Sequence, residues 1–181
     1  MTPALHHCRS ALDRARVMGQ SACVSWDSLF VDRVRELAGR ESGLAVVVTY
    51  RRDGSAQTSV VNAGVIEHPL TGEPVVGFVV QGGSRRKLAN LRARPLATVV
   101  FRSGWDWVAV EGEVDLIGPE DHLDGFARGD VPSVFHAIYV AAIGGTAEQW
   151  SVRDDEIDRE RHTAVLVRPV RAYSNPADEA Q

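Results

Sequence analysis

The sequence predicts a mainly β protein of the α+β kind, with about six antiparallel strands forming a small barrel and helices flanking it. Three observations indicate this fold class. Short runs rich in valine recur along the chain, with glycine, proline or aspartate close to their ends. Helical spacing of apolar residues occurs before the first run and again after residue 118. The 181 residues, 44% of them hydrophobic, are enough for one well-filled domain.

The expected elements follow one another with short turns. Ser28 is a candidate cap for the first helix, and Gly39 is a candidate stop. Asp53 and Gly54 favour a hairpin turn between the first two strands. In chain order we expect a helix at 28–38, strands at 44–50, 55–66, 75–80, 97–101 and 108–114, and a last strand at 163–167.

The region after residue 118 changes to helical spacing. Pro119, Glu120 and Asp121 are residue types that suit the first turn of a helix. Residues 123–149 then alternate helical spacing with loop residues, and the charged stretch 150–161 predicts another helix. We expect one domain at 27–176, with a poorly ordered extension at 1–26 and a tail at 177–181.

Charge argues against nucleic acid as a partner. The net charge is −4, from 20 basic and 24 acidic residues, whereas nucleic-acid-binding proteins usually carry a basic excess. Positive charge is instead concentrated within ten positions, which suits a small anionic ligand. This basic patch consists of Arg85, Arg86, Lys87, Arg92 and Arg94.

The expected cellular location depends on the membrane-spanning and signal segments that the sequence lacks. No apolar run approaches the ~20 residues that span a bilayer, and the first residues have no basic start followed by an apolar stretch. Cys8 and Cys23 do not make a disulfide framework. We therefore expect a soluble cytoplasmic protein with no membrane partner.

A glycine-rich turn that enters a basic helix is the candidate site. Free N–H groups at a helix N-terminus and nearby basic side chains together suit a phosphate. Lys87 is the first candidate for this contact. Consecutive helical residues diverge by about 100°, so at most one of Arg85 and Arg86 joins Lys87 at the same anion. The turn itself contributes Gly83 and Ser84.

The stretch from Ser84 to Pro95, followed by a strand and by Val110-Glu111-Gly112-Glu113, resembles the split-barrel flavin and deazaflavin oxidoreductases. These are the relatives of pyridoxamine 5'-phosphate oxidase, and the resemblance is closer to the actinobacterial branch that uses the deazaflavin coenzyme F-420. Residues 53–62, 158–161 and 168–173 support it. The resemblance implies a split β-barrel with the pyridoxamine-phosphate-oxidase-like FMN-binding fold, and a homodimer with the cofactor at its interface.

Further contacts are implied by the same resemblance. Asn90, three positions after Lys87 on the same helix face, is similar to a family position near the cofactor. Trp105 and Trp107 share one side of an extended segment. There they can stack on the flavin ring, line a substrate pocket or lie at the dimer interface.

The strand around residue 60 resembles the one beneath the flavin ring in that family. Strand alternation places Ser59 and Val61 on one face and Val60 and Asn62 on the other. Only one pair can contact the ring directly, and both valines are equally compatible with a plain core position.

No catalytic constellation of side chains accompanies this site. The sequence has no Gly-x-Ser-x-Gly elbow, and its six scattered histidines and lack of Cys-x-x-Cys predict no metal. Hydride transfer fits such a site, because the cofactor carries the chemistry while the protein supplies orientation and electrostatics. The expected activity is an oxidoreductase that transfers a hydride between reduced coenzyme F-420 and a small unsaturated organic substrate of the quinone, enone or tetrapyrrole type.

Alternatives remain open for the cofactor and the role. FMN also presents a phosphate and a flat ring, so an FMN-dependent oxidoreductase of the pyridoxamine 5'-phosphate oxidase type is the second interpretation. A non-catalytic flavin- or deazaflavin-binding protein is the third. The five cations favour the deazaflavin with its longer anionic tail, unless Arg92 and Arg94 only solvate the end of their helix.

Overall fold

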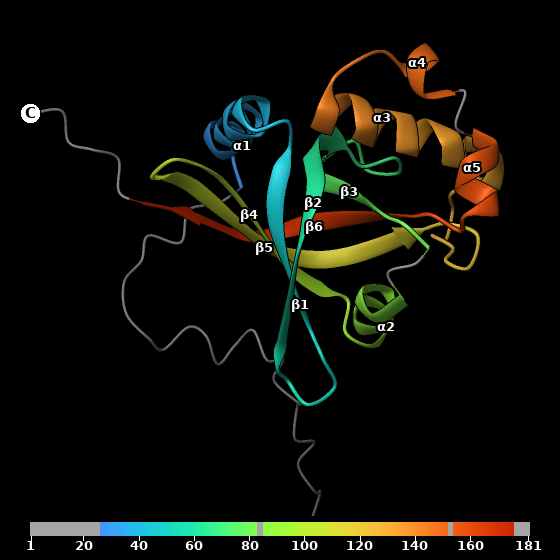
Figure 1. Ribbon diagram of the computed structural model, residues 1–181, viewed down its shortest axis with the longest axis horizontal. Coiled ribbons are helices and arrows are strands. Elements are labelled where there is room, and N and C mark those ends of the chain that lie inside the picture. Colours follow the sequence, from blue (N-terminus) through green and yellow to red (C-terminus); the bar gives the residue numbers. More distant parts are fainter. Residues whose placement is uncertain (1–25, 83–84, 152–153, 176–181) are drawn as a thin grey trace, which may run out of the picture.

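The computed structural model describes residues 26–82, 85–151 and 154–175, which form an antiparallel barrel with flanking helices (Figure 1). Its six strands close in the order β1-β2-β3-β6-β5-β4, which confirms the predicted fold class. The elements are α1 (Ser28–Arg40), β1 (Leu44–Tyr50), β2 (Ala56–Glu67), β3 (Pro74–Val80), α2 (Arg85–Ala93), β4 (Leu96–Ser103), β5 (Asp106–Ile117), η2 (Arg128–Asp130), α3 (Val131–Ile143), α4 (Ala147–Ser151), α5 (Asp154–Arg159) and β6 (Thr163–Ser174).

Alternate residues of the strands fill the barrel. Val47, Val99 and Val110 are paired in register across β1, β4 and β5, and all three are fully buried. Phe78 and Phe101 are also fully buried in the same cluster. Because strand residues alternate between two faces, the residues between these positions point outward from the barrel.

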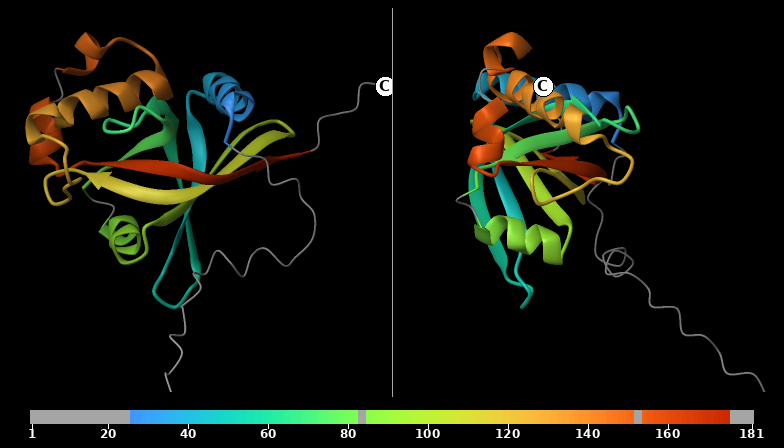
Figure 2. Two further views of the ribbon diagram at one scale, coloured as in Figure 1. Left: turned by 180° about the vertical axis from the view of Figure 1, so that it is seen from behind. Right: turned by 90° about the vertical axis from the view of Figure 1, so that its right-hand side faces the viewer.

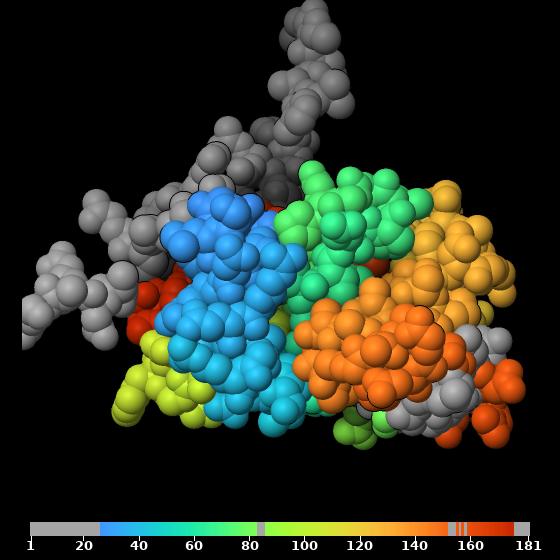
Figure 3. All heavy atoms as spheres, turned by 90° about the horizontal axis from the view of Figure 1, so that it is seen from above, coloured from blue at the N-terminus to red at the C-terminus, as the bar shows by residue number. Residues whose placement is uncertain are grey.

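Helices lie on two sides of the barrel. α1 and α3 lie beside each other over one side, and α2 lies on the opposite side (Figure 2, Figure 3). The buried stripe of α1 is Val31, Val34 and Leu37, which joins the barrel core. Within the described ranges, no helix is both long and apolar enough to cross a membrane.

Pairing between β2 and β3 covers only part of each strand. β2 pairs with β3 only from Ala63 to Glu67, while residues 56–62 of β2 pair with β1 alone. Beyond Phe78, which is paired with Ala63, β3 continues only along β6. Pairing between the two strands therefore ends at Ala63 and Phe78, and we call the region beyond these residues, where β2 and β3 are not paired, the split. Because a strand points its hydrogen-bonding groups to both edges, part of the backbone of 56–62 faces the split.

The start of the first helix differs from the prediction. Asp27, not Ser28, is the cap: its carboxylate accepts from the backbone N–H groups of Leu29 (3.1 Å) and Phe30 (3.2 Å). Gly39 lies inside the helix, which continues to Arg40. Trp26, which we had assigned to the extension, donates its indole N–H to the carbonyl of Pro74 at 2.8 Å. Residues 1–25 lie outside the described residues.

Two predictions after residue 118 are corrected. Residues 119–121 do not begin a helix, because the Asp121 carboxylate is bonded to other elements instead of capping a turn. The last strand does not stop at 167. β6 continues to Ser174 along β5, with a register shift at Glu111 and Gly112 that accommodates Pro169. The helix expected at 150–161 is described only as α5 and the end of α4.

Close packing of α3 on β2 requires a glycine at position 64. A Cβ added to Gly64 would lie 2.5 Å from the backbone carbonyl carbon of Ala141, which cannot move like a flexible side chain. We expect Gly64→Ala to lower the free energy of unfolding by about 1–3 kcal/mol. Gly39→Ala is the matched control, because a Cβ there meets nothing within 4 Å. It should stabilise the exposed helix by about 0.5–1 kcal/mol. Urea denaturation of both variants checks this, and equal effects would contradict the packing argument.

Candidate functional site

The candidate site lies where the split begins, beside α2. Lys87 on α2 places its ammonium nitrogen 5.9 Å from the ring centroid of Phe78, the last β3 residue paired with β2. Only 7% of Lys87 is exposed, and it is the only lysine of the chain. A lysine this deeply buried is uncommon unless a negative group accompanies it.

No negative group balances Lys87 within the described residues. Burial alone lowers the pKa of Lys87 from its usual 10.5, with no opposing contribution from a carboxylate. The aromatic face of Phe78 attracts the ammonium only weakly at this distance. The site therefore holds a cation that is desolvated and lacks a counter-charge, which is the property an anionic ligand would satisfy.

A glycine brings the chain close to the start of β6 just before α2. A Cβ at Gly82 would overlap the backbone carbonyl oxygen of Glu160. Position 82 therefore has to be glycine for the turn to pack there. Gly83 and Ser84, both predicted contacts, lie outside the described residues, as does the side chain of Arg85.

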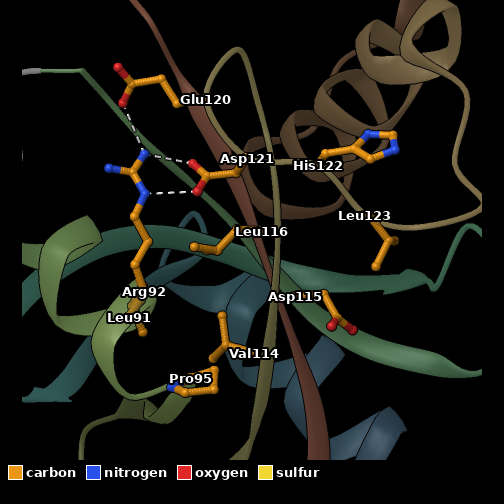
Figure 4. Close-up of a pocket in the computed structure, with 10 residues that line it drawn as sticks. All are labelled: Leu91, Arg92, Pro95, Val114, Asp115, Leu116, Glu120, Asp121, His122 and Leu123. Carbon is orange, nitrogen blue, oxygen red and sulfur yellow. Dashed lines mark hydrogen bonds and ion pairs between the residues drawn. The ribbon is translucent and has the colours of Figure 1, made fainter.

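The five-cation patch does not act as one surface. Arg92 lines a groove of about 350 Å³ between α2 and β5, where it faces the carboxylates of Glu120 and Asp121 (Figure 4). Its guanidinium donates twice to Asp121, at 2.7 Å each, and once to Glu120 at 3.1 Å. The bonds to Asp121 raise the pKa of Arg92. Arg86 and Arg94 are exposed, and in the described part of the chain neither forms an ion pair.

The side-chain amide of Asn90 forms hydrogen bonds with two neighbouring strands. Its amide nitrogen donates to the hydroxyl of Thr49 (3.2 Å) and to the side-chain oxygen of Gln57 (3.0 Å). Thr49 and Gln57 are paired in register on β1 and β2. Asn90 therefore ties α2 to the part of β2 that borders the split. Sequence reasoning missed Gln57, although strand alternation places it on the same face as Ser59.

The structure shows which residues of β2 face the barrel and which face outward. Ser59 and Val61 are half-buried on the barrel side, and Val61 packs against the core. Val60 is 65% exposed on the outer face, where Asn62 also lies and donates to the carbonyl of Ser42 at 2.8 Å. Of these four residues, Ser59 is the polar one that shares a face with Gln57.

The two predicted tryptophans lie far from Lys87 within one chain. Trp105 is 95% exposed at the tip of the β4–β5 hairpin, which lies away from α2 (Figure 1). Arg33 and Arg40 of α1 hold this tip by pairing with Asp106, each at 3.1 Å. Trp107 packs edge-on against Tyr173, with ring centroids 5.9 Å apart.

The described residues contain no group of three or more histidine, cysteine, aspartate or glutamate side chains placed to hold a metal ion. Several charged side chains on the outer barrel surface are paired with each other. Arg171 donates to Glu111, and Tyr173 donates its hydroxyl to the same carboxylate at 2.8 Å. Burial and this carboxylate raise the pKa of Tyr173 to about 12.

Comparison with known proteins gives the fold but no close relative. No family model and no curated protein matches the sequence. A conserved hypothetical protein from Mycobacterium tuberculosis is 18% identical with a TM-score of 0.58, over 91% of this chain and 98% of that one. A pyridoxamine 5'-phosphate oxidase-related, FMN-binding protein from Nostoc punctiforme is 11% identical with a TM-score of 0.57, over 83% of each chain.

The chain has the split-barrel fold of pyridoxamine 5'-phosphate oxidase-related proteins. A heme-binding protein from Mycobacterium smegmatis shares this split barrel, with 15% identity and a TM-score of 0.54 over 87% of this chain and 57% of that one. Proteins with this fold therefore differ in the group that they bind. The side chains at the split, more than the fold, must carry the functional argument for this split-barrel protein.

Removal of the Lys87 charge should stabilise the ligand-free protein. Lys87→Met keeps the length and apolar contacts of the side chain but leaves no desolvated cation, so we expect a gain of about 1–2 kcal/mol in the free energy of unfolding at pH 7. The gain should shrink as pH rises toward 10.5. Above the lowered pKa, the folded protein releases the Lys87 proton while the unfolded chain still holds it, so wild-type stability increases relative to the variant. Urea denaturation at pH 7, 9 and 10 measures the difference, and a less stable Lys87→Met protein would contradict the assignment.

Proposed function

We propose that the split binds a phosphate-bearing flavin-type cofactor, with the phosphate at Lys87, and that the protein is an oxidoreductase. One observation carries the proposal: the buried ammonium of Lys87 lies where the split begins, and no described residue supplies it with a counter-charge. A phosphate would restore the interaction that burial removes, through charge-assisted hydrogen bonds. The N-terminus of α2, two residues before Lys87, adds a favourable dipole for the same anion.

The residues along β2 suit the remainder of such a cofactor. Part of the backbone of 56–62 is directed to the split, and the side chain of Ser59 is small, so a flat ring could approach this strand closely. When bound, the cofactor supplies hydride transfer, in which two electrons and one proton pass to an unsaturated substrate and solvent supplies the second proton. The chain's own contribution would then be to bind, orient and desolvate the cofactor and its substrate.

We further propose coenzyme F-420 as the cofactor and a small unsaturated organic molecule as the substrate. Arg86 and Arg94 are exposed near Lys87 in sequence and are free of ion pairs within the described residues, so they can attract the anionic tail of the deazaflavin. The pairing of Arg92 with Asp121 reduces the cation surplus on which this choice depends. FMN is therefore the second candidate, and the fold shared with the FMN-binding protein from Nostoc punctiforme favours it.

The outer face of the barrel is our proposed homodimer interface. Val46 of β1 is paired with Val60 of β2 and with Val100 of β4, so these three side chains share one outward row. Val60 is 65% exposed and Leu44 on the same strand as Val46 is 48% exposed. A second copy would cover this apolar row, and it would bring another chain next to the split because β2 borders both.

Titration with coenzyme F-420 and with FMN tests the cofactor. We expect F-420 to bind more tightly and to lose more affinity at high ionic strength, because its tail meets exposed cations. Lys87→Ala should weaken both ligands by about 1.5–3 kcal/mol, and Arg86→Ala should chiefly reduce the salt dependence for F-420. Fluorescence provides the measurement. Tighter FMN binding would assign the protein to FMN, and unchanged affinity in Lys87→Ala would refute the phosphate site.

The single lysine allows the contact to be observed directly. In protein labelled with 13C-lysine, one side-chain NMR signal should titrate with a pKa below 10.5. Addition of the bound cofactor should raise this pKa, because a nearby phosphate favours the charged ammonium. An unmoved pKa would contradict the contact.

Stopped-flow mixing of the reduced complex with quinones, enones and tetrapyrroles then separates an enzyme from a non-catalytic binding protein.

Sedimentation velocity tests the dimer. Val60→Asp places a charge at the β2 end of the apolar row and should convert a dimer to monomers, because a buried unpaired carboxylate opposes association. Leu70→Asp is the matched control, since Leu70 is also apolar and 46% exposed but lies in the turn between β2 and β3. A monomeric wild type, or equal effects of the two variants, would refute this interface.

A further inference from the structure

Arg92 fixes the last turn of α2 to the barrel. Its Nε and Nη2 atoms each donate to a different oxygen of the Asp121 carboxylate, both at 2.7 Å. This two-point geometry fixes the orientation of the guanidinium as well as its distance. Asn90 and Arg92 are two residues apart, so their side chains leave the helix about 200° apart. Arg92 therefore holds the flank of α2 that Asn90 does not reach.

Asp121 is itself held by two strands. It closes the turn after β5, where backbone hydrogen bonds join it to Gly118 in both directions, at 3.0 and 3.3 Å. A Cβ on Gly118 would lie 2.9 Å from the carbonyl oxygen of His162, so this turn packs directly on the residue before β6. The hydroxyl of Thr163, the first residue of β6, donates to Oδ2 of Asp121 at 3.4 Å. Because 9% of its side chain is exposed, Asp121 is a fixed point of the barrel to which Arg92 binds.

The position of α2 decides whether the Lys87 ammonium is desolvated. A helix of 9 residues is too short to be stable by itself, so contacts with the barrel must hold it in place. Leu88 and Leu91 supply apolar contacts, and both are buried. Burial of the Lys87 charge opposes these contacts, because an outward movement of the helix would return the ammonium to water. The charge-assisted bonds between Arg92 and Asp121 resist that movement.

We propose that Asp121 is a positioning residue for Lys87: through Arg92 it holds α2 against the barrel, and it thereby keeps the ammonium desolvated where an anion would bind. The inference rests on the proposed function, since it takes Lys87 as the anion contact. Loss of the pair would allow α2 to populate an outward position with a hydrated ammonium. An anion would then bind more weakly, because only the inward fraction of the molecules offers the desolvated charge.

The direction of a pKa change separates positioning from a simple charge effect. Removal of a carboxylate by itself lowers the pKa of a nearby lysine, whereas hydration of a buried ammonium raises it. In ligand-free protein labelled with 13C-lysine, we therefore expect Asp121→Ala to raise the pKa of Lys87 toward 10.5. Asp121→Asn keeps the shape of the side chain but weakens the bonds to Arg92, so it should produce a smaller rise.

Binding of inorganic phosphate, followed on the same Lys87 signal, provides the second readout. We expect Asp121→Ala to weaken phosphate about fivefold. Asp106→Ala is the matched control, because Asp106 also joins a helix to the barrel through arginine, but at α1. It should change neither the pKa of Lys87 nor the phosphate affinity. The double variant Arg92→Leu/Asp121→Leu leaves neither charge unpaired, so it should fold and should match Asp121→Ala in both readouts.

Three other results would each overturn a definite claim. An unchanged or lowered pKa of Lys87 in the folded Asp121 variants would overturn the positioning role and leave Lys87 as the phosphate contact. A raised pKa with unchanged phosphate affinity would overturn the link between desolvation and binding. Failure of phosphate, FMN and F-420 to bind the wild-type protein would instead overturn the proposed function.

Discussion

The desolvated ammonium of Lys87 is the constraint on which the rest of this site depends. Burial opposes its charge, and no carboxylate among the described residues compensates. Natural proteins rarely retain a buried cation of this kind without a use for it, because an apolar side chain would fit with less cost in stability. We expect the charge to lower the stability of the ligand-free protein, and the proposed binding of an anion would be the corresponding gain.

Several contacts keep α2 at the position that buries this charge. Asn90 ties the helix to β1 and β2, and Arg92 ties its last turn to Asp121. The hydroxyl of Thr163 also donates to Asp121 at 3.4 Å, so this carboxylate links α2 to the start of β6. The helix that carries Lys87 is therefore held on both sides of the split, and the ammonium is positioned before any ligand arrives.

The tip of the β4–β5 hairpin, at the end of the molecule away from α2, is also held by side-chain contacts. Ion pairs from α1 immobilise the tip of the β4–β5 hairpin, and yet that tip presents Trp105 almost entirely to solvent. A rigidly supported aromatic side chain loses little conformational entropy on association, which favours contact with another surface. The proposed dimer is consistent with this arrangement, because β4 contributes to both the hairpin and the apolar outer row.

Local sequence patterns determined most of the fold and singled out Lys87 as a candidate. Valine-rich alternation predicted the strands, and the glycine turn before a basic helix pointed to Lys87, since both signals depend on neighbours in the chain. The length of β6, the cap at Asp27 and the pairing of Arg92 with Asp121 depend on partners far away in sequence. Only tertiary structure could decide that Lys87 is buried and unbalanced, that β2 and β3 separate beside it, and that Asn90 orients Gln57. Those properties arise from packing between distant segments, which no local pattern encodes.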